Sequence, residues 1–131
     1  MSAGLACLVC HMDAEKKDQA GLPTVEQCAV CHTSSSQHPD PAVGAELKKL
    51  AEIHSRKERV KWVRVYRVPD IVFFSHRNHL KAGEKCVTCH GPVASRHVLA
   101  KEVSTSMTTC MNCHMSRRVP NECYLCHDLG Q

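Results

Sequence analysis

The sequence predicts a mostly irregular fold, with a few short helices and at most one small two-stranded sheet, whose core is not made of its own side chains. The first observation is the cysteine content: ten of 131 residues, close to the ~8% share of cross-linked or metal-bearing chains. The second is the aromatic content of 4%, which is too low for an ordinary packed core. This length suits one domain, residues 1–131. We therefore expect bound groups to fill the interior.

Regular structure is expected in only a few places. Apolar residues and His54 recur at helical spacing over 43–57, which predicts one helix. β-Branched and aromatic residues cluster over 61–74, on both sides of Pro69-Asp70, which predicts two short strand-like pieces. The segments near the cysteines are rich in Ser, Thr, Pro and Gly, so loops and single turns are expected there.

Hydropathy and charge argue against a transmembrane segment in this chain and against nucleic acid as a partner. The longest nearly uncharged stretch, 68–75, is interrupted by Pro69 and Asp70, and a membrane-spanning helix needs about 18 apolar residues. The net charge of +4 comes without a basic run or an aromatic-interleaved stripe, so nucleic acid is not expected as a partner.

All ten cysteines belong to five copies of the pattern C-x-x-C-H, here called motifs 1 to 5. The motifs span 7–11, 28–32, 86–90, 110–114 and 123–127. Their cysteines are Cys7, Cys10, Cys28, Cys31, Cys86, Cys89, Cys110, Cys113, Cys123 and Cys126, and their histidines are His11, His32, His90, His114 and His127. Two thiols at this spacing add to the two vinyl groups of one haem, and the next histidine binds the iron. The motifs predict five covalently attached haem c groups.

Three other uses of paired cysteines fit less well. Zinc sites take four thiolates from two pairs, but five pairs is an odd number and the following histidine has no role there. A redox-active C-x-x-C occurs once in a βαβ domain, a pattern that this chain lacks. Disulfides between cysteines separated by only two residues close loops too short to stabilise a fold.

The histidines outside the motifs are candidates for the sixth iron ligand. They are His38, His54, His76, His79 and His97. Five haems and five spare histidines suggest bis-histidine coordination, which is typical of low-potential electron carriers. His76 and His79, three residues apart, would lie on one side of a helical turn and bind two neighbouring haems. His38 in a Ser/Pro-rich loop and His54 on the expected helix are as compatible with surface positions as with ligand roles.

Around these residues the chain resembles known families. The run Phe74-Ser75-His76, followed by His79 and by motif 3, resembles the class III multihaem cytochromes c, in which that histidine pair binds two different haems. A longer resemblance, over almost the whole chain, is to the pentahaem cytochrome c subunit of alternative complex III. The residues that carry it are 7–11, 20–23, 28–32, 62–65, 68–70, 73–76, His79, 86–91, and Met107 three residues before Cys110.

The resemblance to the alternative complex III subunit adds two expectations about ligands. It implies Met107 as a sixth ligand near Cys110, in which case His97 need not be one; packing of Met107 against a haem face is the alternative. That family also carries an F-x-H-x-x-H segment before its first motif, whereas six residues precede Cys7 here. His76, His79 and Met107 could then serve three haems, which leaves two to be completed by His38, His54 or His97, or by a histidine from a neighbouring chain.

These features predict an exported pentahaem cytochrome that passes electrons between redox protein partners. The alternative is a structural, haem-bearing subunit of a larger membrane electron-transfer complex or of a filament. A multihaem reductase fits less well, because all five motifs are complete and so short a chain leaves little room for a substrate pocket. Thioether attachment takes place outside the cytoplasmic membrane, so we expect a periplasmic or extracellular location and a leader that has been removed or precedes this start.

Overall fold

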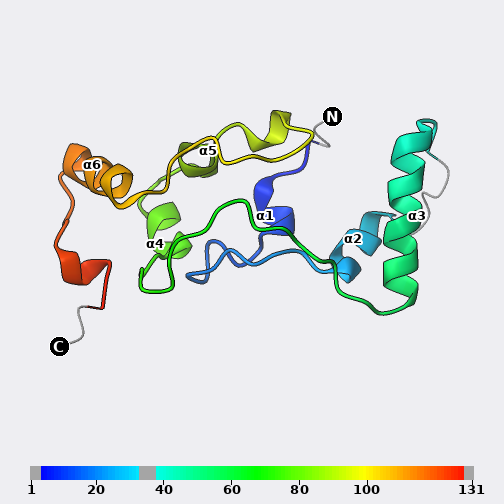
Figure 1. Ribbon diagram of the computed structural model, residues 1–131, viewed down its shortest axis with the longest axis horizontal. Helices are drawn as coiled ribbons and strands as arrows, with labels where there is room; N and C mark the ends of the chain where they lie inside the picture. The colour runs from blue at the N-terminus through cyan, green and yellow to red at the C-terminus, as the bar shows by residue number, and fades with distance from the viewer. Residues whose placement is uncertain (1–3, 33–37, 129–131) are drawn as a thin grey trace. The chain divides into compact units, whose positions relative to one another are not determined.

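A computed structural model describes residues 4–32 and 38–128 of the chain (Figure 1). The chain divides into two compact units, one formed by residues 21–63 and the other by the described residues on either side of that segment. Each unit is described by itself below. The expectation of a single domain over 1–131 stays a prediction.

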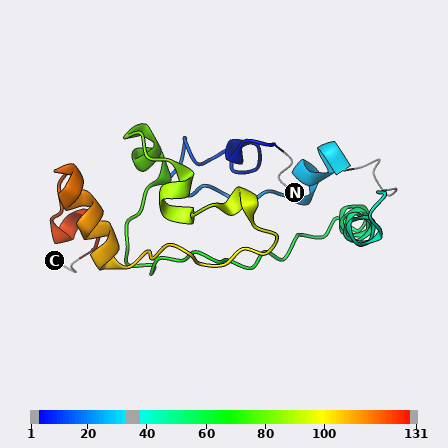
Figure 2. The ribbon, with the colours of Figure 1, turned by 90° about the horizontal axis from the view of Figure 1, so that it is seen from above.

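The unit of residues 21–63 consists of two helices, α2 (Val25–His32) and α3 (Pro41–Ser55), which lie side by side in both views of the chain (Figures 1 and 2). Thr24 begins α2 with a capping box: its Oγ1 accepts from the Gln27 N–H, and its own N–H donates to Gln27 Oε1 at 2.8 Å. The end of the 21–63 segment lies close to the start of α2, where Trp62 Nε1–H donates to the Pro23 carbonyl at 2.9 Å.

The prediction of a helix over 43–57 is confirmed by α3, with a shift of two residues at each end. The helix begins earlier because the Asp40 carboxylate accepts from the Ala42 N–H at 2.9 Å and Pro41 occupies the first turn. It ends at Arg56, where the backbone continues into Lys57 with a positive φ of 55°. The side chains of Leu47, Leu50 and Ile53, half-buried, lie along one side of the helix.

The other unit holds the remaining helical elements. They are α1 (Cys7–Cys10), α4 (His76–Lys81), α5 (Cys86–His90), η1 (Val93–Ser95), α6 (Met107–Arg117) and η2 (Cys123–Leu125). The prediction of loops and single turns near the cysteines is wrong for α6, which has eleven residues, and for α2, which has eight. Ser106 explains the start of α6, because its side chain accepts from the Thr109 N–H and caps the helix.

The two strand-like pieces expected over 61–74 do not form a sheet. Among the described residues the only β pairing is an isolated antiparallel bridge between Val72 and His127. Beside it the Phe73 N–H donates to the Cys126 carbonyl at 2.8 Å. The β-branched residues therefore favour extended backbone, but no neighbouring segment runs alongside for long enough to pair with it.

Side chains alone give this chain almost no core. Of the described residues only Ala14, Val25, Ala29 and Gly91 are buried. The accessible surface is 10699 Å², whereas a packed protein of 14.6 kDa exposes about 6,900 Å². Many large apolar side chains, such as Val63 at 87% exposure, would lie in water. The described part of the chain has no helix that is long and apolar enough to span a membrane.

Candidate haem sites

Each C-x-x-C-H motif lies on a helical turn. Motif 1 overlaps α1, motif 2 ends α2, motif 3 forms α5, motif 4 lies within α6 and motif 5 begins with η2. Cysteines three residues apart therefore project from one side of a turn and can reach a common group. All ten thiols are free of disulfide bonds, and none is fully buried. This arrangement fits thioether attachment and gives no support to a disulfide framework.

The thiols of four motifs are neighbours in a definite order. Burial raises the pKa of the Cys86 thiol, and the Cys7 thiol, hydrogen-bonded to it, raises that pKa further. Burial and then a thiol of motif 4 raise the pKa of Cys89. Burial and then Cys126 raise the pKa of Cys110. Motifs 1, 3, 4 and 5 thus follow one another in this order, as α1, α5, α6 and η2 do in Figure 1.

Helix α4 presents two histidines with defined ring orientations. Ser75 begins the helix by accepting the Asn78 N–H, and its hydroxyl donates to the Asp18 carboxylate. The His79 Nδ1–H donates to the Ser75 carbonyl at 2.8 Å, and the His76 Nδ1–H donates to the Asp18 carbonyl at 2.8 Å. Because a carbonyl only accepts, each neutral ring carries its proton on Nδ1 and leaves the Nε2 lone pair available to a metal.

Both of these rings face a motif histidine. The ring centroids of His76 and His90 lie 6.3 Å apart with 5° between the planes. Those of His79 and His114 lie 6.1 Å apart with 51° between the planes. The prediction that His76 and His79 lie on one helical turn is confirmed, and each has a different motif histidine opposite.

The separation of the rings fits one iron atom between each pair. Metal–imidazole bonds of about 2 Å, extended to the ring centres, put the centroids of two axial imidazoles about 6 Å apart. Burial lowers the pKa of His90, and the neighbouring His76 and His11 lower it further, which favours the neutral, ligating form. Among the described residues, no group of three His, Cys, Asp or Glu gathers as it would around a bare metal ion. Two opposed imidazoles suit a metal held in a planar ring.

Two motif histidines are oriented in the same way as the α4 pair. The His114 Nδ1–H donates to the Pro120 carbonyl at 2.7 Å, and the His127 Nδ1–H donates to the Ile71 carbonyl at 3.3 Å. Such second hydrogen bonds fix the tautomer and raise the basicity of a ligating imidazole.

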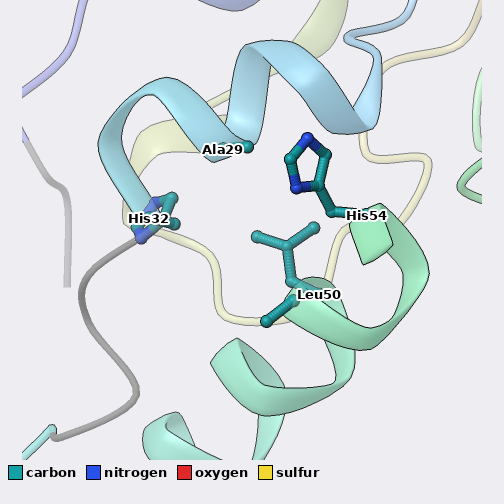
Figure 3. Close-up of a pocket in the computed structure, with 5 residues that line it drawn as sticks. Ala29, His32, Leu50 and His54 are labelled. Atoms are coloured by element: carbon teal, nitrogen blue, oxygen red, sulfur yellow. The ribbon is translucent and has the colours of Figure 1, made fainter. Parts of the chain in front are cut away.

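The unit of residues 21–63 contains a pocket between α2 and α3. Its lining residues are Ala29, His32, Leu50, Ala51 and His54. In Figure 3 the His54 side chain projects from α3 toward α2, while His32 ends α2, so both imidazoles border the same space. Apart from the histidines the lining is aliphatic, as suits the face of a large planar ring.

The comparisons with known proteins agree with this chemistry. Residues 72–128 match the family described as cytochrome c7 and related cytochrome c. The chain is also 30% identical, over 151 residues, to the menaquinone reductase multiheme cytochrome c subunit of Nitratidesulfovibrio vulgaris. That alignment covers 95% of this chain and 70% of the relative. The chain belongs to the multihaem cytochromes c.

Membership of this family makes the cytochrome an electron-transport protein with covalent haem c. The match over 72–128 includes α4 and motifs 3 to 5, where both ring pairs lie. It confirms the multihaem resemblance predicted from Phe74-Ser75-His76, while the resemblance to alternative complex III stays a prediction.

The structure does not place the other three candidate ligands opposite a motif histidine. His38 Nδ1 accepts the Asp40 N–H at 3.0 Å, which makes it part of the start of α3. The exposed His97 makes no hydrogen bond, ion pair or ring contact with the described residues. Met107, 63% exposed, is the first residue of α6. Ligand roles for His38, His97 and Met107 stay predictions.

Sequence reasoning missed the residues that orient the ligands. The backbone carbonyls of Asp18, Ile71 and Pro120 each receive an imidazole N–H, and no sequence signal marks a carbonyl for this role. Tyr66 was also missed, although its hydroxyl contacts the backbone of His90. A lone tyrosine in an extended segment carries no pattern from which this contact can be predicted.

Proposed function

We propose that this cytochrome carries five haem c groups, one on each motif, and passes electrons along them between redox protein partners outside the cytoplasmic membrane. The observation that carries the proposal is that each of the two histidine rings on α4 lies opposite the ring of a motif histidine. In both pairs the distance between the rings is the one expected for two ligands of a single iron. Bound haem iron supplies reversible one-electron chemistry. The chain supplies thiols for attachment, imidazoles for ligation and the spacing between neighbouring motifs.

The ring pairs assign two sixth ligands. His76 serves the haem of motif 3, opposite His90, and His79 serves the haem of motif 4, opposite His114. Because the two distal ligands are three residues apart on α4, the two haems are held beside each other. The thiols of motifs 1 and 3, 3 and 4, and 4 and 5 are neighbours, so the haems on these motifs would form one continuous chain for electron transfer within this unit.

The haem of motif 2 belongs to the unit of residues 21–63. His32 is its proximal ligand and His54 its distal ligand, since both border the pocket between α2 and α3. Leu50 and Ala51 of α3 and the buried Ala29 of α2 line the same space and would contact the bound group.

The haem of motif 5 takes its sixth ligand from outside the described residues. None of the described residues sets a second imidazole against His127, whose recorded ring contact is with the Ile71 carbonyl. A neighbouring subunit can supply the ligand, which favours a role as part of a larger electron-transfer complex or filament. The relative is a menaquinone reductase subunit, so we propose a quinone-reducing membrane complex as the first assembly to test.

No substrate is transformed under this proposal. The described pocket is bordered by two imidazoles, and two opposed ligands close both axial positions of an iron. Electron exchange with partners then needs only a haem edge near the surface and a small, transient interface.

The experiment is a count of haems and of their ligands on protein produced with haem-attachment machinery. Mass spectrometry of the intact chain and of its peptides is expected to show one haem on each of the five motif peptides. Potentiometric titration should show reversible reduction by five electrons, and ferric absorption should show low-spin haems at motifs 2, 3 and 4. Fewer than five haems, or high-spin iron at motif 3 or 4, would contradict the proposal.

A further inference from the structure

The hydroxyl of Tyr66 connects three backbone groups from two segments. It donates to the His90 carbonyl at 3.2 Å, and it accepts from the N–H groups of Glu102 and Val103 at 3.1 and 3.3 Å. One donor and two acceptor positions are all that a tyrosine hydroxyl offers, so its hydrogen-bonding capacity is fully used.

The ring of Tyr66 also contacts the ring of His90. Their centroids are 4.8 Å apart and the planes meet at 78°, an edge-to-face contact. On its other side His90 faces His76 in the parallel pair. The Tyr66 side chain thus contacts His90, the proposed iron ligand of motif 3, through its ring and binds the backbone of His90 through its hydroxyl.

The segment that Tyr66 holds is fixed from its other side as well. Glu102 forms a two-bond ion pair with Arg96, whose Nε and Nη2 both donate to the carboxylate. Gly91, directly after His90, is buried with φ of +68°, and a Cβ there would lie 3.4 Å from the Glu102 Cβ. The backbone at Glu102 and Val103 therefore lies close to the backbone at His90 and Gly91, and the Tyr66 hydroxyl is hydrogen-bonded to both segments.

Among the described residues, His90 lacks a ring hydrogen bond that four of the other proposed ligands have. The rings of His76, His79, His114 and His127 each donate Nδ1–H to a carbonyl. Within the described part of the chain the His90 ring makes no such hydrogen bond, and its recorded ring contacts are with Tyr66 and His76. The orientation of this one imidazole is set by packing.

We propose that Tyr66 is the positioning residue for His90 and sets the ring orientation, and hence the redox potential, of the motif 3 haem. The inference rests on the proposed haem at motif 3. Axial-ligand orientation and the hydrogen bonding of the ligand are among the means by which a protein tunes a haem. Motif 3 lies between motifs 1 and 4, so its potential affects every electron that crosses this unit.

The test compares Tyr66→Phe and Tyr66→Leu with Trp62→Phe in the full haem-loaded chain. Tyr66→Phe keeps the ring and removes three hydrogen bonds, whereas Tyr66→Leu also removes the ring contact. Trp62 is the control for the loss of a single aromatic hydrogen bond outside the motifs, because its Nε1–H donates to the Pro23 carbonyl within the unit of residues 21–63. Proton NMR of the ferric protein follows the ring methyls of each haem, which report imidazole orientation, and a redox titration follows the potential of each haem.

We expect the methyl resonances and the potential of the motif 3 haem to shift in both Tyr66 variants, more in Tyr66→Leu, and to stay unchanged in Trp62→Phe. The amides of Glu102 and Val103 should exchange roughly tenfold faster in Tyr66→Phe. Unmoved motif 3 resonances, or equal shifts at all haems, would overturn the inference while leaving the proposed function intact. If wild-type peptide 86–90 carries no haem, the proposed function fails, and the inference fails with it.

Discussion

The imidazole of His76 lies parallel to that of His90, with 5° between the planes and 6.3 Å between the centroids. One turn further along α4, the ring of His79 lies at a similar distance, 6.1 Å, from that of a different motif histidine, His114, with 51° between the planes. The six-residue helix α4 thus carries the histidines that lie opposite the motif 3 and motif 4 histidines. Changes within α4 should affect two neighbouring haems in distinguishable ways.

The first prediction separates the two α4 ligands. His76→Ala should make the motif 3 haem five-coordinate and high-spin, and His79→Ala should do the same at motif 4, because each removes one of two opposed imidazoles. Magnetic circular dichroism and carbon monoxide binding to the reduced protein would detect one altered haem in each variant. His97→Ala is the control, and we expect it to leave both haems low-spin. An unaltered spectrum for His76→Ala would refute the pairing.

The second prediction concerns the start of α4. Ser75→Ala removes the helix cap and the hydrogen bond to Asp18, so we expect a loss of about 1–2 kcal/mol in the free energy of unfolding. Guanidinium titration followed by far-ultraviolet circular dichroism measures this loss. Ser116→Ala is the matched control: its hydroxyl donates to the Cys113 carbonyl inside α6, and alanine favours helix, so we expect little change there. Equal losses in the two variants would argue against a special role for Ser75.

Much of the candidate site could be predicted from the sequence, because the residues that attach and ligate each haem follow short local patterns. The C-x-x-C-H motifs, the helix of His54 and the turn that carries His76 and His79 all follow from spacing within a few residues. The ring pairs themselves could not be predicted, because the position of His76 depends on hydrogen bonds from its backbone and its ring to the carbonyl of Asp18, which is distant in sequence. Such contacts depend on the path of the chain and leave no pattern in the side chains.

The errors over regular structure have a related cause. The β-branched run over 61–74 has the composition of a strand, yet a strand also needs a partner, and in the described chain only Val72 meets one. Helix α6 was missed because Ser and Thr near Cys110 suggested a loop, whereas Ser106 uses its side chain to cap a helix. Composition alone was misleading in both places: in the described chain the strand-like run lacks a pairing partner beyond Val72, and the Ser-rich segment begins with a helix cap.

The third prediction tests the haem site of the unit of residues 21–63. His54→Ala should convert the motif 2 haem to a high-spin form that binds carbon monoxide, because it removes the imidazole opposite His32 across the pocket. His38→Ala is the control, since the His38 ring accepts a backbone hydrogen bond at the start of α3 and should not affect any haem. A high-spin haem in His38→Ala, with His54→Ala unaltered, would mean that His38 and not His54 is the ligand.

The fourth prediction is that the chain without haem does not fold. Helices α1, α4 and α5 have four to six residues, and helices shorter than about 12–15 residues are marginal in water. Only four described residues are buried, so hydrophobic burial cannot offset the conformational entropy of ordering the chain. Chain produced without haem-attachment machinery should show little helical circular dichroism and no cooperative thermal transition. The haem-loaded protein is the control, and a cooperative transition of the haem-free chain would mean that side chains do form a sufficient core.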